Sequence, residues 1–418
     1  MPLQHNIDTE GPLPFGSYRT LGNHKFDSKP VSLLSIGLNF WNHPVLSTNN
    51  PDVDIDVAVR HAHKLIDSGF TTFNTNIPKR VMGSTYSTKS LQDKWIERNI
   101  FANLVRDTPP SVLGKVNLGT RIRVPSLRED ESFSPSKVRQ IIGESIIDIY
   151  SETKGCLDSV ELDVSSTRNN NNDDISPYTL DILDVLTEMQ REGLIRSISG
   201  NDFSKNSLHK IQSSGFDLDS IRIPCNVLDP TKYANHGGEK TKLILNSPLA
   251  GGILTDKFYD LENRNRDKTG IPRLDLLTKS ELHQLNSSIY RVWRLNYQKK
   301  NGVQISKSQA WRLVESSVIG TLHQIAVKHN ADLASVAIRW AMQMDKIGSV
   351  SVGSSLNALD DNDSPFSRPR SLRKAFTFHL DEEDMSLLQE ITGGPLFQDE
   401  SPNPESLMID MNNKKLWL

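Results

Sequence analysis

The sequence predicts an α/β fold in which eight parallel strands close into a (β/α)8 barrel, the TIM barrel. Short apolar runs alternate with segments of helical periodicity along the chain, which is the pattern of βαβ units. There are eight such runs, and no GxGxxG motif follows the first one. The missing glycine motif disfavours the open doubly wound sheet, which is the competing architecture.

The expected elements follow from the spacing of apolar residues. We expect strands at residues 31–38, 71–76, 115–122, 158–165, 194–199, 220–225, 242–247 and 349–353. We expect helices at residues 54–69, 91–105, 138–152, 179–193 and 334–343. In the first helix the apolar residues Ile55, Val59, Ala62 and Ile66 recur near one face, and Gly69 marks its end.

The expected organisation is one barrel domain from Tyr18 to Ile391, which begins with a β-hairpin. It is preceded by an extension at residues 1–17 and followed by a tail at residues 394–418. A charged insertion at about residues 259–307 follows the seventh strand, on the side where the loops of a TIM barrel build the active site. This insertion could be a lid, a surface for a protein partner, or a neutral addition.

Composition restricts the classes of partner. The formal net charge of −3 provides no basic field for nucleic acid and no cationic face for a membrane. The two cysteines, Cys156 and Cys225, form neither a disulfide framework nor a CxxC pattern, and we expect no metal. The N-terminus resembles no secretory signal, and no run approaches the roughly 20 apolar residues of a membrane span. We therefore expect a soluble cytoplasmic protein; an organellar leader already removed from the sequence is the alternative.

Four motifs in order carry a family resemblance. They are YRTLG from Tyr18, GLIRSISGNDF from Gly193, NSPLAGGILTDKF from Asn246, and ASVAIRWAMQ followed by SVSVGSS. Together they resemble the aldo-keto reductases, which are NADP-dependent oxidoreductase barrels. The third motif, similar to YSPLAGGLLTGKY of that family, is the most specific. The resemblance covers residues 18–391 apart from the insertion.

The resemblance implies hydride transfer between a nicotinamide and a small carbonyl compound, alcohol or sugar. In that family a tyrosine donates the proton, a lysine paired with an aspartate lowers the pKa of the tyrosine, and a histidine orients the carbonyl. The positions of the aspartate, tyrosine, lysine and histidine hold Asn74, Lys79, Arg121 and Ser166 here. Arginine stays protonated and cannot be tuned as lysine can. Tyr86 could return a phenol to the site if its loop is re-routed.

The resemblance also implies a cofactor face. Asn201 and Asp202 stand where the family binds the carboxamide, Arg222 replaces a glutamine, and Cys225 replaces an aromatic ring that stacks on the nicotinamide. Asn and Asp side chains can still hydrogen-bond an amide. The alternative interpretation of these residues is a satisfied polar cluster at the barrel rim.

The phosphate-binding part of that face would consist of backbone groups. We expect it to be formed by Ser247, Pro248, Leu249, Gly251, Gly252, Gly353, Ser354 and Ser355. Adjacent glycines let the backbone approach a ligand and expose N–H groups to anions, although such a loop can also merely cap a strand. No lysine or arginine follows Gly353 directly, so we expect weak binding of NADP or NAD with little preference. Farther along, Arg368, Arg370 and Arg373 could supply a 2′-phosphate contact or form a solvated basic loop.

Three functions remain open at the level of sequence. The chain could be an aldo-keto reductase whose activity is impaired by the four replacements. It could be a non-catalytic barrel that binds a nucleotide or acts as a scaffold or regulator, which would make it a pseudoenzyme. It could also use Arg121 and Lys79 as an anion-binding pair. Fold alone does not decide among them.

Overall fold

The computed structural model describes the barrel and most of its surrounding helices. The residues described are 13, 17–19, 31–37, 55–75, 100, 102–123, 136, 140, 143, 157–163, 175, 177–230, 233, 236, 241–259, 306–353 and 369–393. The expected tail at 394–418 lies outside them. So do the expected insertion, apart from its ends, and the expected N-terminal extension, apart from Leu13 and Ser17. The domain limits therefore stay a prediction.

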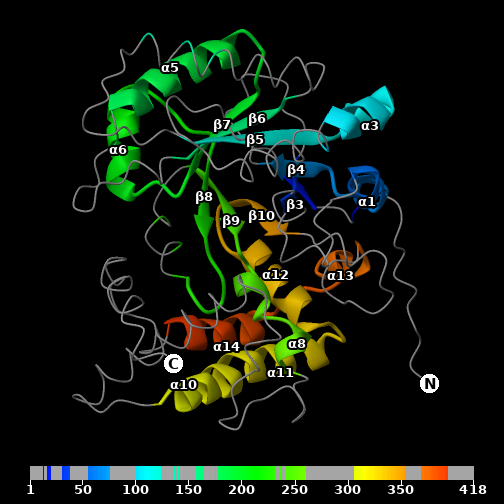
Figure 1. Cartoon of the computed structure of the whole chain (residues 1–418). Helices are drawn as coiled ribbons and strands as arrows, with labels where there is room; N and C mark the ends of the chain where they lie inside the picture. The colour runs from blue at the N-terminus through cyan, green and yellow to red at the C-terminus, as the bar shows by residue number, and fades with distance from the viewer. Residues whose placement is uncertain are drawn as a thin grey trace.

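Eight parallel strands form a closed barrel, which confirms the predicted (β/α)8 fold (Figure 1). Their order around the barrel is β10-β3-β4-β5-β6-β7-β8-β9. The strands are β3 (Leu34–Gly37), β4 (Thr72–Thr75), β5 (Asn117–Arg123), β6 (Ser159–Asp163), β7 (Ser197–Asn201), β8 (Ser220–Pro224), β9 (Lys242–Asn246) and β10 (Ile347–Gly353). Each predicted strand overlaps one of them.

A two-stranded hairpin precedes the barrel, as predicted. It consists of β1 (Tyr18–Arg19) and β2 (Val31–Ser32), which pair antiparallel. The Tyr18 hydroxyl donates to the carbonyl of Gly69 at 2.9 Å, and the N–H of Ser32 donates to the Thr72 hydroxyl at 2.9 Å. Both acceptors lie just before or at the start of β4, so the hairpin sits at the amino-terminal end of the barrel strands.

The helices begin and end at recognisable signals. The helices whose bounds the structure gives are α1 (Ile55–Asp67), α3 (Pro110–Leu113), α5 (Pro177–Arg191), α6 (Lys205–Ser213), α8 (Asp256–Tyr259), α10 (Lys307–Val314), α11 (Gly320–Lys328), α12 (Leu333–Gln343), α13 (Pro369–Lys374) and α14 (Glu382–Gly393). A 3-10 turn, η3 (Ala250–Gly252), follows β9, and a π-helical segment, η5 (Glu315–Ile319), joins α10 to α11. Ser306 and Gln309 form a capping box at the start of α10, which satisfies backbone donors that the helix leaves unpaired.

One strand begins later than the sequence predicted. We expected a strand from Leu194, whereas β7 begins at Ser197. Gly193 has a left-handed φ of 78°, and the N–H of Leu194 donates back to the carbonyl of Met189 at 3.0 Å. These residues thus complete the end of α5, and the apolar Leu194 and Ile195 belong to that turn.

The barrel strands are apolar on the helix side and polar on the lumen side. Successive residues of a barrel strand face opposite sides of the wall. In β6, Val160 and Leu162 belong to the buried apolar core, while Ser159, Glu161 and Asp163 alternate with them. The same alternation places the hydroxyls of Ser199 and Ser220 on the lumen side, 2.6 Å apart. The apolar burial of the wall is therefore concentrated on its outer face.

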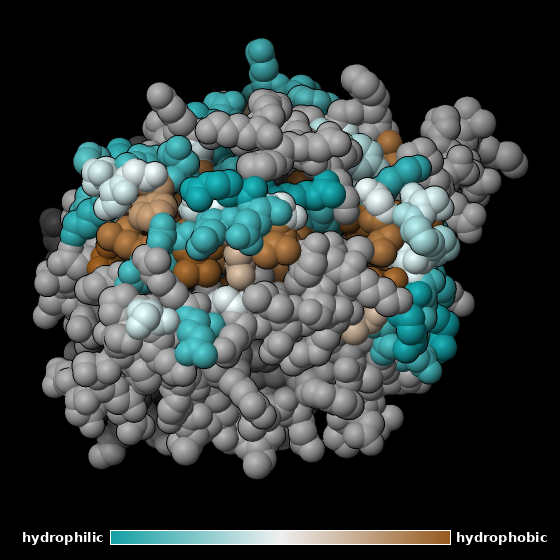
Figure 2. All heavy atoms as spheres, turned by 90° about the horizontal axis from the view of Figure 1, so that it is seen from above, coloured by the Kyte–Doolittle hydropathy of each residue, from teal (hydrophilic) through white to brown (hydrophobic). Residues whose placement is uncertain are grey.

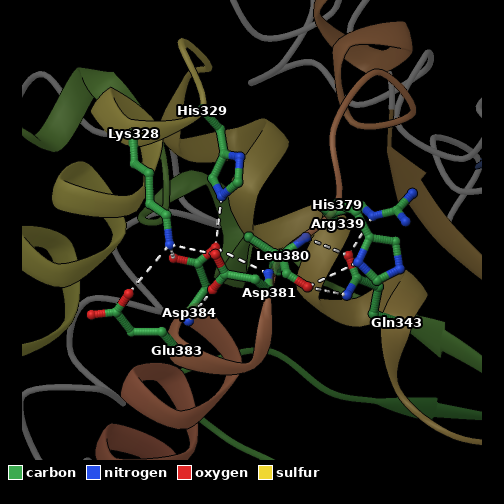
Figure 3. A network of polar contacts seen from close by, with 9 residues as sticks. All are labelled: Lys328, His329, Arg339, Gln343, His379, Leu380, Asp381, Glu383 and Asp384. Carbon is green, nitrogen blue, oxygen red and sulfur yellow. Dashed lines mark hydrogen bonds and ion pairs between the residues drawn. The ribbon is translucent and has the colours of Figure 1, made fainter.

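Polar contacts hold α14, the last helix that the structure describes, to its neighbours (Figure 3). Lys328 at the end of α11 donates to Asp384 at 2.9 Å and to Asp381 at 2.7 Å, just before α14. The hydrogen bond from Lys328 lowers the pKa of Asp381 to about 2. His329 contacts the buried Asp384 at 2.6 Å, and the Gln343 amide at the end of α12 donates to the carbonyl of Leu380 at 2.9 Å. Figure 1 shows α11 and α14 side by side, as this network requires.

Few large apolar side chains are exposed in the described part of the chain. Figure 2 looks onto the side of α5 and α6, where hydrophilic and hydrophobic side chains reach the surface next to one another. Among the described residues the exposed large hydrophobic side chains are Tyr259 and Val327. The Tyr259 ring stacks on His323 of α11 with centroids 3.8 Å apart. The chain is thus held to α11 at the point where the expected insertion begins.

Within the described ranges, no helix combines the length and the apolarity needed to cross a membrane.

Candidate active site

Three charged side chains from three strands meet inside the barrel. The Nε of Arg121 on β5 donates to Glu161 Oε1 on β6 at 2.5 Å, and the Nε of Arg222 on β8 donates to Glu161 Oε2. Strand β7 lies between β6 and β8, and its lumen residue beside Glu161 is the small Ser199. A small residue there leaves space for the Arg222 side chain to reach Glu161 across β7.

This lumen cluster of Arg121, Glu161 and Arg222 carries one net positive charge. The side chains of Glu161 and Arg222 are 9% and 4% exposed, whereas that of Arg121 is 20% exposed. Burial lowers the pKa of Arg222, Glu161 opposes that shift, and the positive Arg121 adds to it. Arginine nevertheless stays protonated in proteins, so both guanidinium groups remain charged. In the part of the chain that the structure describes, their hydrogen bonds are the two to Glu161.

Asn74 lies on β4 beside this cluster. It is paired in register with Gly119 of β5, two residues before Arg121. A Cβ atom on Gly119 would come within 2.4 Å of both the Asn74 amide oxygen and the Ser159 hydroxyl. A larger residue at position 119 would therefore require the side chains of Asn74 and Ser159 to move. Asn74 and Arg121, predicted for the family's aspartate and lysine positions, thus lie on neighbouring strands and face the same lumen.

The structure describes the fourth barrel strand as far as Asp163. Ser166, which we placed at the end of this strand, lies beyond that point, so its position stays a prediction. Asp163 is 1% exposed and is paired in register with Asn201 of β7. Ser166, Lys79 and Tyr86 all lie outside the described residues. Glu161 and Asp163 were not predicted, although the alternation Ser-Val-Glu-Leu-Asp could have revealed a polar lumen face.

Asn201 and Asp202 follow one another at the mouth, where β7 ends. Asn201 is paired in register with Arg222, and the Asp202 N–H donates to the Arg222 carbonyl at 2.8 Å. Asp202 has a left-handed φ of 55°, which turns the chain away from the strand. His236 lies close by, since its Nε2 is 2.8 Å from the carbonyl of Phe203. Nothing in the sequence pattern marked this buried histidine.

Cys225 does not lie where the sequence led us to expect it. Its side chain is fully buried in the apolar core, and burial raises the pKa of the thiol. It has no surface against which a ring could stack, so the assignment to the cofactor face was wrong. Asn246, which ends β9, is half-buried, and its side-chain oxygen is buried without a hydrogen-bond partner. Asn246 is the first residue of the NSPLAGG motif, yet it was not among the predicted cofactor contacts.

The loop after β9 has an unusual backbone. Ser247, Ala250, Gly251 and Gly252 have φ values of 58°, 48°, 68° and 103°. The N–H groups of Ala250 and Gly252 donate within the loop, to the carbonyls of Ser247 and Leu249. Among the described residues no hydrogen bond uses the N–H of Ser247 or Leu249. Pro248 is buried and fixes the turn, so this loop presents backbone donors in a fixed arrangement.

Solved structures similar to this one are reductase barrels. The thermostable aldo-keto reductase Tm1743, solved with the inhibitor epalrestat, is 15% identical with a TM-score of 0.52, and the match covers 90% of this chain and 99% of that one. The Bombyx mori aldo-keto reductase AKR2E4, solved with NADP, is 13% identical with a TM-score of 0.53 over 91% of this chain and 93% of that one. An aldo/keto reductase from Brucella melitensis is 12% identical with a TM-score of 0.52, over 91% and 99%. At these identities the likeness establishes the fold.

Sequence comparison decides the family. The model of the aldo/keto reductase family matches residues 158–392, which is more than half of the chain. The chain belongs to the aldo/keto reductase family. A comparison with curated proteins finds no significant match.

The family match is uneven along this aldo/keto reductase. It includes Glu161, Asn201, Arg222 and the loop after β9, but begins after Asn74 and Arg121. The matched half thus contains the expected cofactor face and Ser166, whereas Asn74, Lys79 and Arg121, the positions predicted for the aspartate, tyrosine and lysine, precede it.

Other predicted cofactor contacts are more scattered. Gly353 is exposed at the end of β10, while Ser354 and Ser355 lie outside the described residues. Arg373 on α13 is buried and donates to the Ser68 carbonyl at 2.5 Å, at the hairpin end of the barrel. The expectation of a solvated basic loop is therefore wrong for Arg373. In the described ranges, no group of three or more His, Cys, Asp or Glu side chains is arranged to hold a metal ion.

Proposed function

We propose that this aldo/keto reductase binds a nicotinamide dinucleotide weakly and reduces carbonyl compounds very slowly or not at all. The observation that supports the proposal is the engagement of Arg121 and Arg222 by Glu161 within the lumen. At the position of the family's tunable lysine stands an arginine that is always charged and already paired. Asn74, at the position of its aspartate, brings no carboxylate.

The donor set around the mouth fits a dinucleotide. The orphaned oxygen of Asn246 can accept from an amide, and the N–H groups of Ser247 and Leu249 can donate to phosphate oxygens. A bound reduced nicotinamide would supply the hydride for carbonyl reduction. Asn201 and Asp202 would orient the carboxamide, since they lie at the end of β7 beside Arg222.

We infer that Arg121 and Asn74 do not supply the proton that the product alkoxide needs. Arg121 cannot release one at neutral pH, and Asn74 has none to give. A positioned general acid typically contributes a factor of about 10² to 10⁴ in rate. We infer that the chain loses at least this factor relative to a complete site, for small carbonyl or sugar substrates alike.

Turnover tests this proposal. We expect no consumption of NADPH or NADH above background with a panel of aldehydes, ketones and sugars, measured by absorbance. Robust turnover would contradict it. If such turnover disappeared in Tyr86→Phe and survived in the matched control Tyr259→Phe, Tyr86 would be the acid. Survival in both variants would direct the search to Lys79.

Nucleotide binding is the second prediction. We expect measurable binding of both NADP and NAD, with affinities within tenfold, a difference below about 1.4 kcal/mol. We expect nucleotide binding to persist because the backbone N–H groups of Ser247 and Leu249 can donate to it. We expect weak binding because Asn246 stands where the similar family motif YSPLAGG has a tyrosine, and an amide offers less stacking surface than an aromatic ring. We expect little preference for NADP over NAD because Ser354, Ser355 and Leu356 carry no positive charge that could pair with the 2′-phosphate of NADP.

Calorimetric titration with each nucleotide measures this preference. An NADP advantage above tenfold would contradict it, and loss of that advantage in Arg368→Ala/Arg370→Ala would assign the contact to those arginines. Arg373 is left unchanged because its bond to Ser68 is structural. Failure of both nucleotides to bind at millimolar concentration would overturn the cofactor proposal.

The second candidate function is a non-catalytic scaffold or regulatory barrel. The same replacement of acid–base residues favours it, and the insertion at about 259–307 is the expected surface for a protein partner. The two candidates differ in nucleotide dependence: a scaffold that needs no nucleotide would bind neither NADP nor NAD in the titration.

A further inference from the structure

We propose that Arg121 and Arg222 form a binding site for the carboxylate group of a small ligand within the barrel. The proposal rests on the proposed function for one point only, that such a ligand would be a carbonyl compound and hence an oxo acid. The anion site itself is inferred from the lumen cluster.

The charge of the cluster favours an anion. Two guanidinium groups share one carboxylate, so the cluster is short of one negative charge. An unneutralised buried charge is costly, because burial removes its hydration. A bound anion would complete the neutralisation and would be attracted more strongly here than at a solvated surface.

The donors that remain on the two arginines favour a carboxylate. Each arginine contacts Glu161 through Nε, and no other hydrogen bond from either guanidinium is found among the described residues. The Nη groups therefore remain as donors. Anchoring through Nε holds each planar guanidinium in one orientation, and such a fork matches the two oxygens of a carboxylate.

Access and size restrict the ligand to a small one. Arg121 is the most exposed member of the cluster and belongs to the strand next to Asn74. Around it the lumen is lined by the small or polar residues Gly119, Asn74 and Ser159. The interior of an eight-stranded barrel is only wide enough for side chains or one small ligand. Asp163, the next lumen residue after Glu161, opposes an anion and will keep the affinity moderate.

Pyruvate and its uncharged methyl ester are the probes. Calorimetric titration of the full chain with each, first without nucleotide and again with NADP present, avoids any dependence on turnover. We expect pyruvate to bind at least tenfold more tightly than methyl pyruvate. Arg121→Gln should weaken pyruvate binding at least tenfold, whereas Arg121→Lys should retain part of the affinity.

The matched control is Arg106→Gln. Arg106 is exposed and paired with the adjacent Asp107, so this variant makes the same change of net charge away from the lumen. We expect its pyruvate affinity to be unchanged. Circular dichroism and thermal unfolding would verify that each variant folds. If Arg121→Gln does not fold, the comparison of pyruvate with methyl pyruvate on the native chain still tests whether the site binds a carboxylate.

Several outcomes would overturn the site. They are equal binding of pyruvate and methyl pyruvate, full retention of affinity in Arg121→Gln, and no pyruvate binding with or without NADP. Inorganic phosphate that binds where pyruvate does not would overturn the carboxylate assignment in favour of phosphate esters. Since NADP affinity is measured separately, loss of pyruvate binding alone would leave the proposed function standing.

Discussion

At the scale of single residues, the buried His61 should make the stability of the fold depend on pH. It is fully buried on α1, and burial, with a smaller contribution from Lys64, lowers its pKa to about 3 from 6.5. Between these values the unfolded chain binds a proton that the folded chain does not. Folding therefore loses stability as pH falls from about 6.5 towards 3, by up to about 1.4 kcal/mol per pH unit.

Urea unfolding at several pH values checks this expectation. The free energy of unfolding should fall less steeply with acidification in His61→Gln than in the native chain, because the variant has no titrating group there. His209→Gln is the matched control, since His209 is exposed on α6. Equal slopes for His61→Gln and the native chain would show that His61 does not cause the loss.

Residue identity within the site was partly predictable. Asn74, Arg121 and Arg222 were named from sequence, and the structure brings all three to the lumen face. Glu161, which joins two of them, was missed because it contacts residues 40 and 61 positions away in sequence. Such a contact exists only once the barrel has closed, and the local sequence of β6 does not indicate which residues Glu161 will contact.

At the scale of elements, the strands were predictable because their outer faces are apolar. Runs such as KLILN and SIRIP show this directly, since alternate residues pack under the helices. Boundaries were less predictable where apolar residues serve a turn, as Leu194 and Ile195 do after α5. The left-handed backbone of Ser247 and Ala250 was not predictable either, because neither residue type favours that conformation.

At the scale of the whole molecule, the two faces of the wall should differ in their contribution to stability. Removing all three charges of the lumen cluster together, as Arg121→Met/Glu161→Leu/Arg222→Met, should leave stability unchanged or raise it by about 1–4 kcal/mol. Leu162→Ala on the outer face should cost about 2–5 kcal/mol, because Leu162 is fully buried in the core.

Guanidinium unfolding of both variants measures the difference. The reason for it is that burial costs the three charges of the lumen cluster their hydration, so their mutual attraction mainly offsets that cost. A triple variant that loses more stability than Leu162→Ala would show that the cluster, and not the apolar shell, holds the barrel closed.

This separation of faces has a consequence for the history of the chain. When the apolar contacts of a barrel lie mainly on its outer face, residues in the lumen can be substituted without loss of the fold. The substitutions must conserve side-chain volume and keep buried charges matched. Natural selection could then replace the reacting groups of an ancestor one after another without ever passing through an unfolded intermediate. The barrel could thus keep its shape while its interior acquired different chemistry.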